Sequence, residues 1–435
     1  MSLCIGSEPV PITLQEAMQR ALHDNLILQQ SRLDERAARW GMVAAISDVL
    51  PQVRFNSSYS RFDEETVFRQ NIFRDVIIQQ YNIDPKDFPP FVYKDYFSSS
   101  ISVDQPIYNG GVEITALHIA SSRKKQIRYS RMVQERATSL QAETAYYNLC
   151  RAQQALEIQR SVLELTELYL KRFQHQRELG LITDTDMLRW EVQKASEESA
   201  LIEAENALTL SQLALAQAVG SGNWEAFYPA DLDILIEEAY QDTAVEVLPL
   251  EHYWSTTLAN SPDLQIIQEG VNLEKQNLWL ASGNFQPKVN FNYIYSWESD
   301  NDLQLDGFTS WVASVNVSMP LFASFGNVAR WQEARVNFKR SQEGAKDFEI
   351  GLRLQLTAAY QEWESALARL SAARKMQQQA AEVLSNQENR HSLGLITTLE
   401  LLDARNTAKQ AELNLINARF DALIARSKLA RIAGM

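Results

Sequence analysis

Cysteine, histidine and clustered basic residues are all scarce in this chain of 435 residues. Its two cysteines, Cys4 and Cys150, are too few for a disulfide framework. The five histidines lie far apart and match no metal-ligand spacing. A net charge of −14 without a basic stripe argues against nucleic acid as a partner, because phosphate binding needs clustered lysine and arginine. The sequence therefore predicts neither a metal site nor a nucleic-acid interface.

Signatures of catalysis and cofactor binding are missing as well. The chain contains no phosphate-binding glycine loop, no dinucleotide fingerprint and no nucleophile elbow. We therefore expect a protein that is not an enzyme and carries no cofactor. No run of about 18 apolar residues is present, so the sequence encodes no transmembrane helix. No apolar signal segment follows Met1; a removed secretion signal stays open, and with it the assignment of Cys4 as an acylated N-terminal cysteine.

What the chain does contain is an internal repeat. The tetrapeptide GLIT occurs at residues 180–183 and again at 394–397, and the shift that superposes the two copies also places Gly220 on Gly434. A second, longer shift joins PQVRFN at 51–56 to PKVNFN at 287–292. The difference between the two shifts is extra sequence in the first half, which we assign to an enlarged loop. A period this long is typical of a duplicated domain and not of a solenoid.

The repeat predicts the organisation of the chain. Each half is expected to contain a helix, two strands and a long helical hairpin; the first helix is marked by apolar residues at helical spacing from Leu14 to Ala44. The predicted first repeat covers 1–220, with strands near 51–62 and 96–106 and a hairpin tip at 180–183. A middle segment at 221–254 follows it. The predicted second repeat covers 255–435, with strands near 287–299 and 309–320 and a hairpin tip at 394–397.

Proline and glycine are absent where the hairpin helices are expected. Neither occurs between Val112 and Leu179, and one helix of that span would be on the order of 100 Å long. Such rods are typical of coiled coils; an ordinary helix bundle fits the local pattern but not the length. At each tip a glycine ends one helix, and Thr183 or Asp184, like Thr397 or Thr398, caps the next. The last helix carries a heptad seam of mostly small residues, namely Ala408, Ala411, Leu415, Ala418, Ala422, Ala425 and Leu429.

The four strand segments alternate between apolar and polar side chains. A sheet that covers a core within one chain would explain this, but the rods offer no such core. Four strands cannot close a barrel, so we expect strands pooled from several chains, with residues 64–96 and 298–307 as outward loops. The residues expected to face a water-filled lumen are Arg54, Asn56, Asn290 and Asn292; those expected to face lipid are Phe55, Tyr59, Tyr293, Tyr295 and Trp311.

Together these features resemble the TolC-like outer-membrane efflux proteins. The likeness covers nearly the whole chain, from ITLQEAMQRALHDN through the strand pairs to the tips RFQHQRELGLITDTDMLRWEVQ and LGLITTLELLDARNTAKQAELNLINARFDAL. It implies a mainly α protein with a β-barrel portion: a homotrimer whose twelve-stranded barrel lies in the lipid of the outer membrane and continues into an α-helical tunnel across the periplasm. It further implies a passive exit duct of a tripartite efflux or secretion system, docked to a periplasmic adaptor and an inner-membrane pump.

Carried over by position, the resemblance also implies roles for residues at the tips. The residues that it implies to dock the adaptor are Gly180, Leu181, Ile182, Gly394, Leu395 and Ile396. The residues that it implies to form a periplasmic gate are Glu400, Asp403 and Asp186. One copy of each acid per subunit around a threefold axis would bring like charges together, which attracts cations and raises carboxylate pKa values. The alternative is that these acids only stabilise the first turn of a helix. A periplasmic coiled-coil structural or adaptor protein without a pore is the second functional hypothesis; it leaves the alternating strands unexplained.

Overall fold

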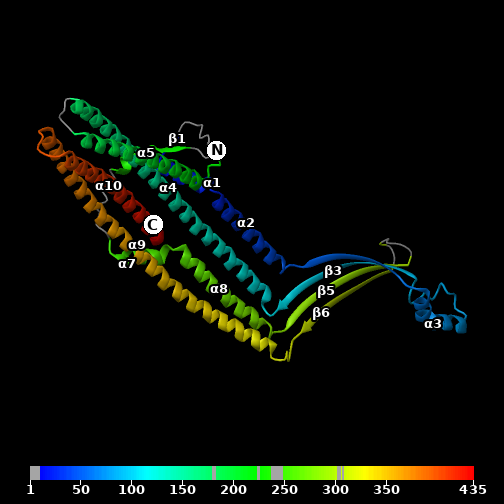
Figure 1. The fold of residues 1–435 in the computed structure, drawn as a ribbon. Helices are drawn as coiled ribbons and strands as arrows, with labels where there is room; N and C mark the ends of the chain where they lie inside the picture. The colour runs from blue at the N-terminus through cyan, green and yellow to red at the C-terminus, as the bar shows by residue number, and fades with distance from the viewer. Residues whose placement is uncertain (1–9, 179–182, 223–225, 237–247, 301–304, 306–307) are drawn as a thin grey trace. The chain divides into compact units, whose positions relative to one another are not determined.

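The computed structural model describes residues 10–178, 183–222, 226–236, 248–300, 305 and 308–435. Two compact units make up the chain (Figure 1), and each takes segments from both predicted repeats. Unit 1 comprises Met1–Arg36, Gln126–Gln268 and Gly344–Met435, and unit 2 comprises Ala37–Lys125 and Glu269–Glu343. The chain is mainly helical and contains one four-stranded and one two-stranded sheet, in agreement with the predicted fold class in its coarse form.

Four long helices carry the two hairpins. Helices α4 (Val112–Glu178) and α9 (Gly326–Ser392) have 67 residues each, and the helices that return from the tips, α5 (Asp184–Val219) and α10 (Thr398–Ala433), have 36 each. Their bounds are offset by the same shift that superposes the two GLIT sequences. Six of the seven predicted seam residues of α10 are buried, and Ala408 is half-buried, so the seam is confirmed as the packing face of this helix.

Each hairpin tip is closed by a threonine cap. Thr397 accepts a hydrogen bond from the amide of Glu400 at 3.3 Å, and the carboxylate of Glu400 accepts one from the amide of Thr397 at 2.7 Å, which is a complete capping box. Thr183 caps α5 through the amide of Asp186 at 3.2 Å. Gly394 has a φ of +70° and ends the preceding helix, as predicted.

The predicted first helix is interrupted. It forms α1 (Leu14–Asp24) and α2 (Leu26–Ser47), because Asn25 takes an extended backbone and its side-chain oxygen accepts the amides of Ile27 and Leu28. The same break recurs at Ser261, between α7 (Leu250–Asn260) and α8 (Pro262–Gly283). The bounds of these two helix pairs are offset by the longer of the two shifts found in the sequence.

The middle segment contributes a strand that the sequence did not reveal. Strand β4 (Phe227–Pro229) pairs in parallel with β1 (Val10–Ile12). Tyr146 of α4 donates a hydrogen bond to the carbonyl of Ile12 at 3.0 Å. Helix α4 is therefore bonded to β1, which in turn pairs with β4 of the middle segment. Phe227 and Tyr146 are fully buried in the same apolar core, within unit 1.

Unit 2 holds one antiparallel sheet in the order β2–β3–β5–β6. Both strands at the edges, β2 and β6, are exposed along most of their length on both faces. Strand β3 is longer than predicted and contains an irregularity between Pro106 and Tyr108. The bounds are β2 (Gln52–Arg61), β3 (Asp95–Asn109), β5 (Lys288–Ser299) and β6 (Phe308–Ser318).

The predicted loop at 64–96 was wrong in one respect, because it contains helix α3 (Glu64–Tyr81), seen in Figure 1 at the end of the sheet. Asp63 caps this helix. The second outward loop begins later than predicted, because β5 includes Glu298 and Ser299. Polar contacts hold α3 to the returning chain: Asn71 is 5% exposed, donates to the carbonyl of Val92 at 2.7 Å and accepts the amide of Phe91 at 2.7 Å.

Replacing Asn71 with alanine is expected to loosen residues 82–94 from α3. The change removes three hydrogen bonds to the partly buried backbone groups of Phe91 and Val92, which costs about 2–3 kcal/mol of local stability. Limited proteolysis should then cut this segment much faster than in the parent protein. Gln79→Ala, an exposed position on the same helix, is the control and should leave the cleavage rate unchanged. Equal cleavage of the two variants would contradict the role of Asn71.

Candidate functional site

The register of the sheet sorts its side chains onto two faces. Phe55 lies opposite Ile101, which lies opposite Tyr295, which in turn lies opposite Trp311, so one row of apolar side chains crosses all four strands. A second row on the same face runs from Val53 through Val103 and Tyr293 to Ala313. The apolar residues that the sequence grouped by parity therefore share one side of the sheet.

The other face carries a polar network centred on Asp104. Arg54 donates to one oxygen of its carboxylate at 3.3 Å, Asn292 donates to the other at 2.5 Å, and Gln52 accepts from Arg54 at 2.5 Å. Two of the predicted lumen residues, Arg54 and Asn292, thus meet at an acid that sequence reasoning missed. The signal was available, because Asp104 continues the polar parity of β3 beyond Ser102.

Asn56 and Asn290 belong to the same face but not to this network. Asn56 lies opposite Ser100, and Asn290 lies opposite Asn316. The face is not wholly polar, since Ile294 and Val312 are paired with each other in the row that contains Arg54. This face of the sheet is therefore mostly polar, with one apolar pair on it.

At the tip between α9 and α10, three leucines are exposed. Leu395 is 64% exposed, as expected of a docking residue, and Leu393 and Leu399, which were not predicted, are similarly exposed. Ile396 differs, because it is half-buried against the cluster that contains Phe173 and Trp190. At the other tip, the predicted residues Gly180, Leu181 and Ile182 lie outside the described residues.

The three predicted gate acids have different environments. The carboxylate of Glu400 accepts hydrogen bonds from the backbone and hydroxyl of Thr397, which lower its pKa. Asp186 accepts a hydrogen bond from the hydroxyl of Thr183 at 2.7 Å. Asp403 is exposed and makes no hydrogen bond or ion pair with the residues that the structure describes. Glu400 therefore completes the capping box of α10, Asp186 binds the hydroxyl of the residue that caps α5, and Asp403 has no such structural role.

His391 lies next to these acids and is packed edge-on against the ring of Phe173 at 5.6 Å. Partial burial lowers the pKa of His391, the charge of Arg172 lowers it further, and the charge of Asp186 opposes both. The imidazole is therefore neutral at pH 7.

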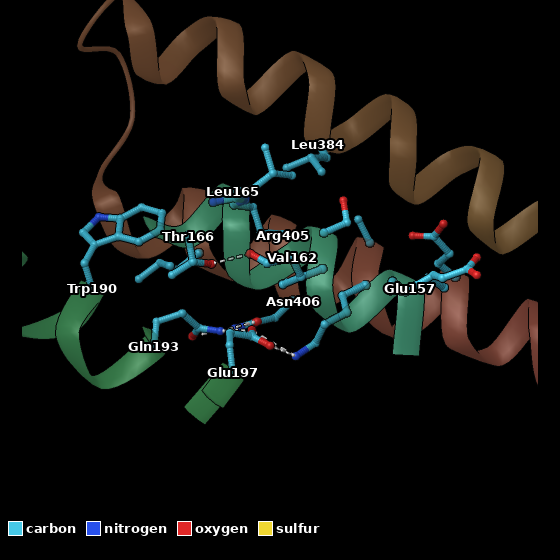
Figure 2. A pocket seen from close by; sticks show the side chains of 16 residues that line it. Glu157, Val162, Leu165, Thr166, Trp190, Gln193, Glu197, Leu384, Arg405 and Asn406 are labelled. Atoms are coloured by element: carbon cyan, nitrogen blue, oxygen red, sulfur yellow. Dashed lines mark hydrogen bonds and ion pairs between the residues drawn. The ribbon is translucent and has the colours of Figure 1, made fainter. Parts of the chain in front are cut away.

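Behind the tip, aromatic and charged residues join the four hairpin helices. Trp190 is fully buried and stacks on Tyr169 at 5.4 Å, and the guanidinium of Arg405 lies 4.3 Å from the centre of the Tyr169 ring. Further along, Glu197 is 1% exposed and forms an ion pair with Lys409 at 2.9 Å. Figure 2 shows Gln193 and Asn406 beside this pair in the hollow between the helices. These contacts hold the helices together and offer no nucleophile or acid–base pair aimed at a substrate.

Long helical hairpins and an antiparallel sheet with two exposed edges give the chain the fold of the solved CmeC outer membrane channel of Campylobacter jejuni, with a TM-score of 0.77, 15% identity, and coverage of 97% of this chain and 85% of CmeC. The chain belongs to the outer membrane efflux protein family, whose sequence pattern matches residues 17–221 and 254–435. Its function is accordingly that of an outer-membrane efflux channel, and the family is not one of enzymes. Among the helices that the structure describes, none has an apolar stretch long enough to cross a bilayer.

Individual relatives are distant in sequence but are matched over about four fifths of their length or more. The outer membrane protein TolC of Vibrio cholerae serotype O1 is 23% identical over 364 residues, which cover 81% of this chain and 80% of TolC. The outer membrane efflux protein BepC of Brucella suis biovar 1 is 20% identical over 377 residues, or 86% of this chain and 79% of BepC. The solved structure of the outer membrane protein VceC from Vibrio cholerae has the same fold, with a TM-score of 0.77, 17% identity, and coverage of 97% of this chain and 96% of VceC.

Proposed function

We propose that three copies of this chain form the exit duct of a tripartite efflux or secretion system. Each copy contributes four strands to a twelve-stranded barrel in the outer membrane and four hairpin helices to a tunnel in the periplasm. The observation that carries the proposal is the sheet itself: both edge strands, β2 and β6, are exposed and unpaired among the described residues. Such edges are unfavourable unless another chain pairs with them.

The geometry of the strands suits this closure. They alternate in direction, so β6 of one copy and β2 of the next would pair in the antiparallel sense. Their lengths of 10 to 15 residues reach the roughly 9–11 residues that a tilted transmembrane strand needs. The face of Arg54 and Asp104 would line the lumen, and the face of Trp311 would meet lipid.

Exposed apolar residues on α2 also favour a partner of the same kind. Leu26, Leu33 and Trp40 recur at heptad spacing, and each is more than half exposed. A heptad row of this type is buried when a second helix packs on it. In the duct, that helix belongs to a sister subunit. We further propose that the two sequence repeats, 1–220 and 255–435, arose by tandem duplication and are joined by 221–254.

The tips are proposed to dock a periplasmic adaptor, which in turn engages an inner-membrane pump. The docking residues are Gly180, Leu181, Ile182, Gly394, Leu395 and the half-buried Ile396. The exposed Leu393 and Leu399 extend the apolar surface that an adaptor would cover. Behind this surface, Asp403 is proposed to form the gate ring, with Glu400 and Asp186 contributing charge while they bind the threonines that cap their helices.

Planar lipid bilayers test the duct and its gate together. The protein is expected to give discrete single-channel currents that are small and cation-selective. Replacing Asp403 and Glu400 with alanine should raise the conductance and reduce the preference for cations, because like charges leave the throat. Asp403→Ala alone should carry most of the change, since Glu400 is engaged by Thr397. Glu203→Ala, an exposed acid further along α5, is the matched control.

The outcomes separate the claims. Inserted protein without any current would contradict the duct. Currents that are unchanged in the double variant would remove the gate assignment and leave the duct standing.

A further inference from the structure

A hollow in unit 1 collects positive charge, although the chain as a whole has a net charge of −14. It has a volume of about 370 Å³ and is bounded by α1, α4 and α10. Arg136, Arg426 and Arg431 line it, and Glu143 is the one acid among its described lining residues, so three cations and one acid give its side chains a net charge of +2. The hollow in Figure 2, by contrast, has two cations and three acids. The charge of the first hollow therefore favours an anion.

The inner wall of this hollow is apolar. Tyr147 and Leu423 are 5% and 3% exposed and belong to the core cluster that also contains Tyr146. The half-buried apolar residues around them are Leu14, Met18 and Leu140. The volume lies at the lower end of the roughly 300–1,000 Å³ that small-molecule sites occupy. The hollow thus combines an apolar wall with basic side chains, on the scale of a small organic molecule and not of a whole phospholipid.

The chain itself engages only part of this positive charge. Arg431 forms no hydrogen bond or ion pair with the residues that the structure describes, although its place in the last turn of α10 is favoured by the helix dipole. Arg136 donates to the carbonyl of Asn260 at 3.4 Å, which uses one of its five N–H groups. Guanidinium groups of the hollow therefore retain donors for a ligand.

Glu143 offsets only part of the charge and is held by neutral groups. Its carboxylate accepts hydrogen bonds from the hydroxyl of Ser427 at 2.6 Å and from that of Tyr147 at 3.1 Å. Burial and the charge of Glu143 raise the pKa of Tyr147, whereas the charge of Arg426 lowers it, so both charges act at the apolar wall. With one carboxylate against three guanidinium groups, a second anion would be bound by charge as well as by hydrogen bonds.

We propose that this hollow is a binding site for a small organic anion that joins a carboxylate, sulfonate or phosphate group to an apolar body. The anionic group would bind Arg426 and Arg431, and the apolar body would cover Leu140 and Leu423. Guanidinium groups suit such oxyanions, because two parallel N–H donors can bind one group. The site lies within one chain, so it does not depend on the proposed barrel or trimer.

Saturation-transfer NMR on the purified protein in a non-ionic detergent can measure this binding. Naphthalene-2-sulfonate is the probe; naphthalene-2-sulfonamide lacks its charge, and methanesulfonate lacks its apolar body. We expect saturable binding of naphthalene-2-sulfonate and several-fold weaker binding of the other two compounds. Arg426→Gln/Arg431→Gln should weaken the binding of naphthalene-2-sulfonate about tenfold or more, because two charge-assisted donors are lost.

Two further variants make the result specific to the hollow. Glu143→Gln should strengthen the binding of naphthalene-2-sulfonate several-fold, because it removes the acid and keeps an acceptor for Ser427 and Tyr147; a gain of this kind cannot come from a damaged fold. Arg123→Gln/Arg128→Gln changes two exposed arginines of α4 outside the hollow and should leave the binding unchanged. Equal binding of the sulfonate and the sulfonamide, or an equal loss in the two double variants, would overturn the site.

Discussion

Gly110→Ala is expected to destabilise the protein by about 2–5 kcal/mol, far more than the same change at its neighbour Gly111. Both glycines have left-handed backbones, which cost alanine about 1–2 kcal/mol. They differ in their surroundings. A β-carbon on Gly110 would collide with the backbone carbonyl of Gly283 at the end of α8, whereas nothing lies within 4 Å of one on Gly111. The overlap adds about 1–3 kcal/mol at Gly110 alone.

Thermal unfolding in a single detergent measures this difference. The midpoint for Gly110→Ala should fall well below that for Gly111→Ala, which should itself lie slightly below the parent. Gly283→Ala provides a reciprocal check, because its β-carbon would lie 2.6 Å from the carbonyl oxygen of Gly110. Equal midpoints for the variants at 110 and 111 would mean that the close approach of the two backbones is not what requires glycine there.

The sequence was most informative where its signals were local. Three of these signals are short-range: the absence of glycine and proline from 112 to 178, the glycine in each GLIT sequence, and the threonine that caps the helix after it. Helices α4 and α10 begin and end where these signals predict. The period of two in the strands is equally local, so the apolar row through Phe55 and Trp311 was predictable.

Features that depend on distant partners were missed. The break at Asn25 combines a local cap on Ile27 and Leu28 with a hydrogen bond from the side chain of Asn25 to the carbonyl of Ala218, 193 residues away. Strand β4 exists because β1 pairs with it, and α3 is held by Asn71 rather than by an apolar face that periodicity could reveal.

In the candidate site as well, features set by the local sequence were predictable, and features that depend on distant partners were not. The polarity of Arg54 and Asn292 could be read from alternation, but their shared acid, Asp104, required the register. The places of Glu400 and Asp186 in the first turns of their helices were predictable as an alternative to the gate, but Asp403 lies beyond the first turn of α10. The gate itself depends on how three chains meet, and it stays a prediction for Asp403.

Lys409→Met is expected to destabilise the hairpin pair by about 3 kcal/mol, at the lower end of the cost of leaving a buried charge alone. Lys409 approaches both oxygens of Glu197, at 3.0 and 2.9 Å, and Glu197 is 1% exposed. Methionine keeps the apolar volume of the lysine chain but removes the cation. The loss is moderated by Gln159, whose amide donates to the same carboxylate at 2.5 Å.

The pH dependence should identify the carboxylate as the cause. Burial alone would raise the pKa of Glu197, but the hydrogen bonds of Lys409 and Gln159 outweigh it and the pKa is lowered. In the parent, this pair therefore stabilises the fold above the unfolded pKa of about 4.3, and the contribution is lost as the pH falls through the folded value. In Lys409→Met, burial dominates and the pKa of Glu197 rises, so the variant should be weakest near pH 8 and approach the parent in mild acid as Glu197 takes up a proton.

Thermal midpoints of both proteins between pH 5 and pH 8 would test this, with Lys409→Met/Glu197→Gln as the matched control. The double variant has no buried charge at this position, so it should recover much of the lost stability and show the same difference from the parent across that range. A deficit in Lys409→Met that is independent of pH, or a double variant as unstable as the single one, would mean that Lys409 acts through packing. Helices α4, α5 and α10 would then be held together behind the tip mainly by the stack of Trp190, Tyr169 and Arg405.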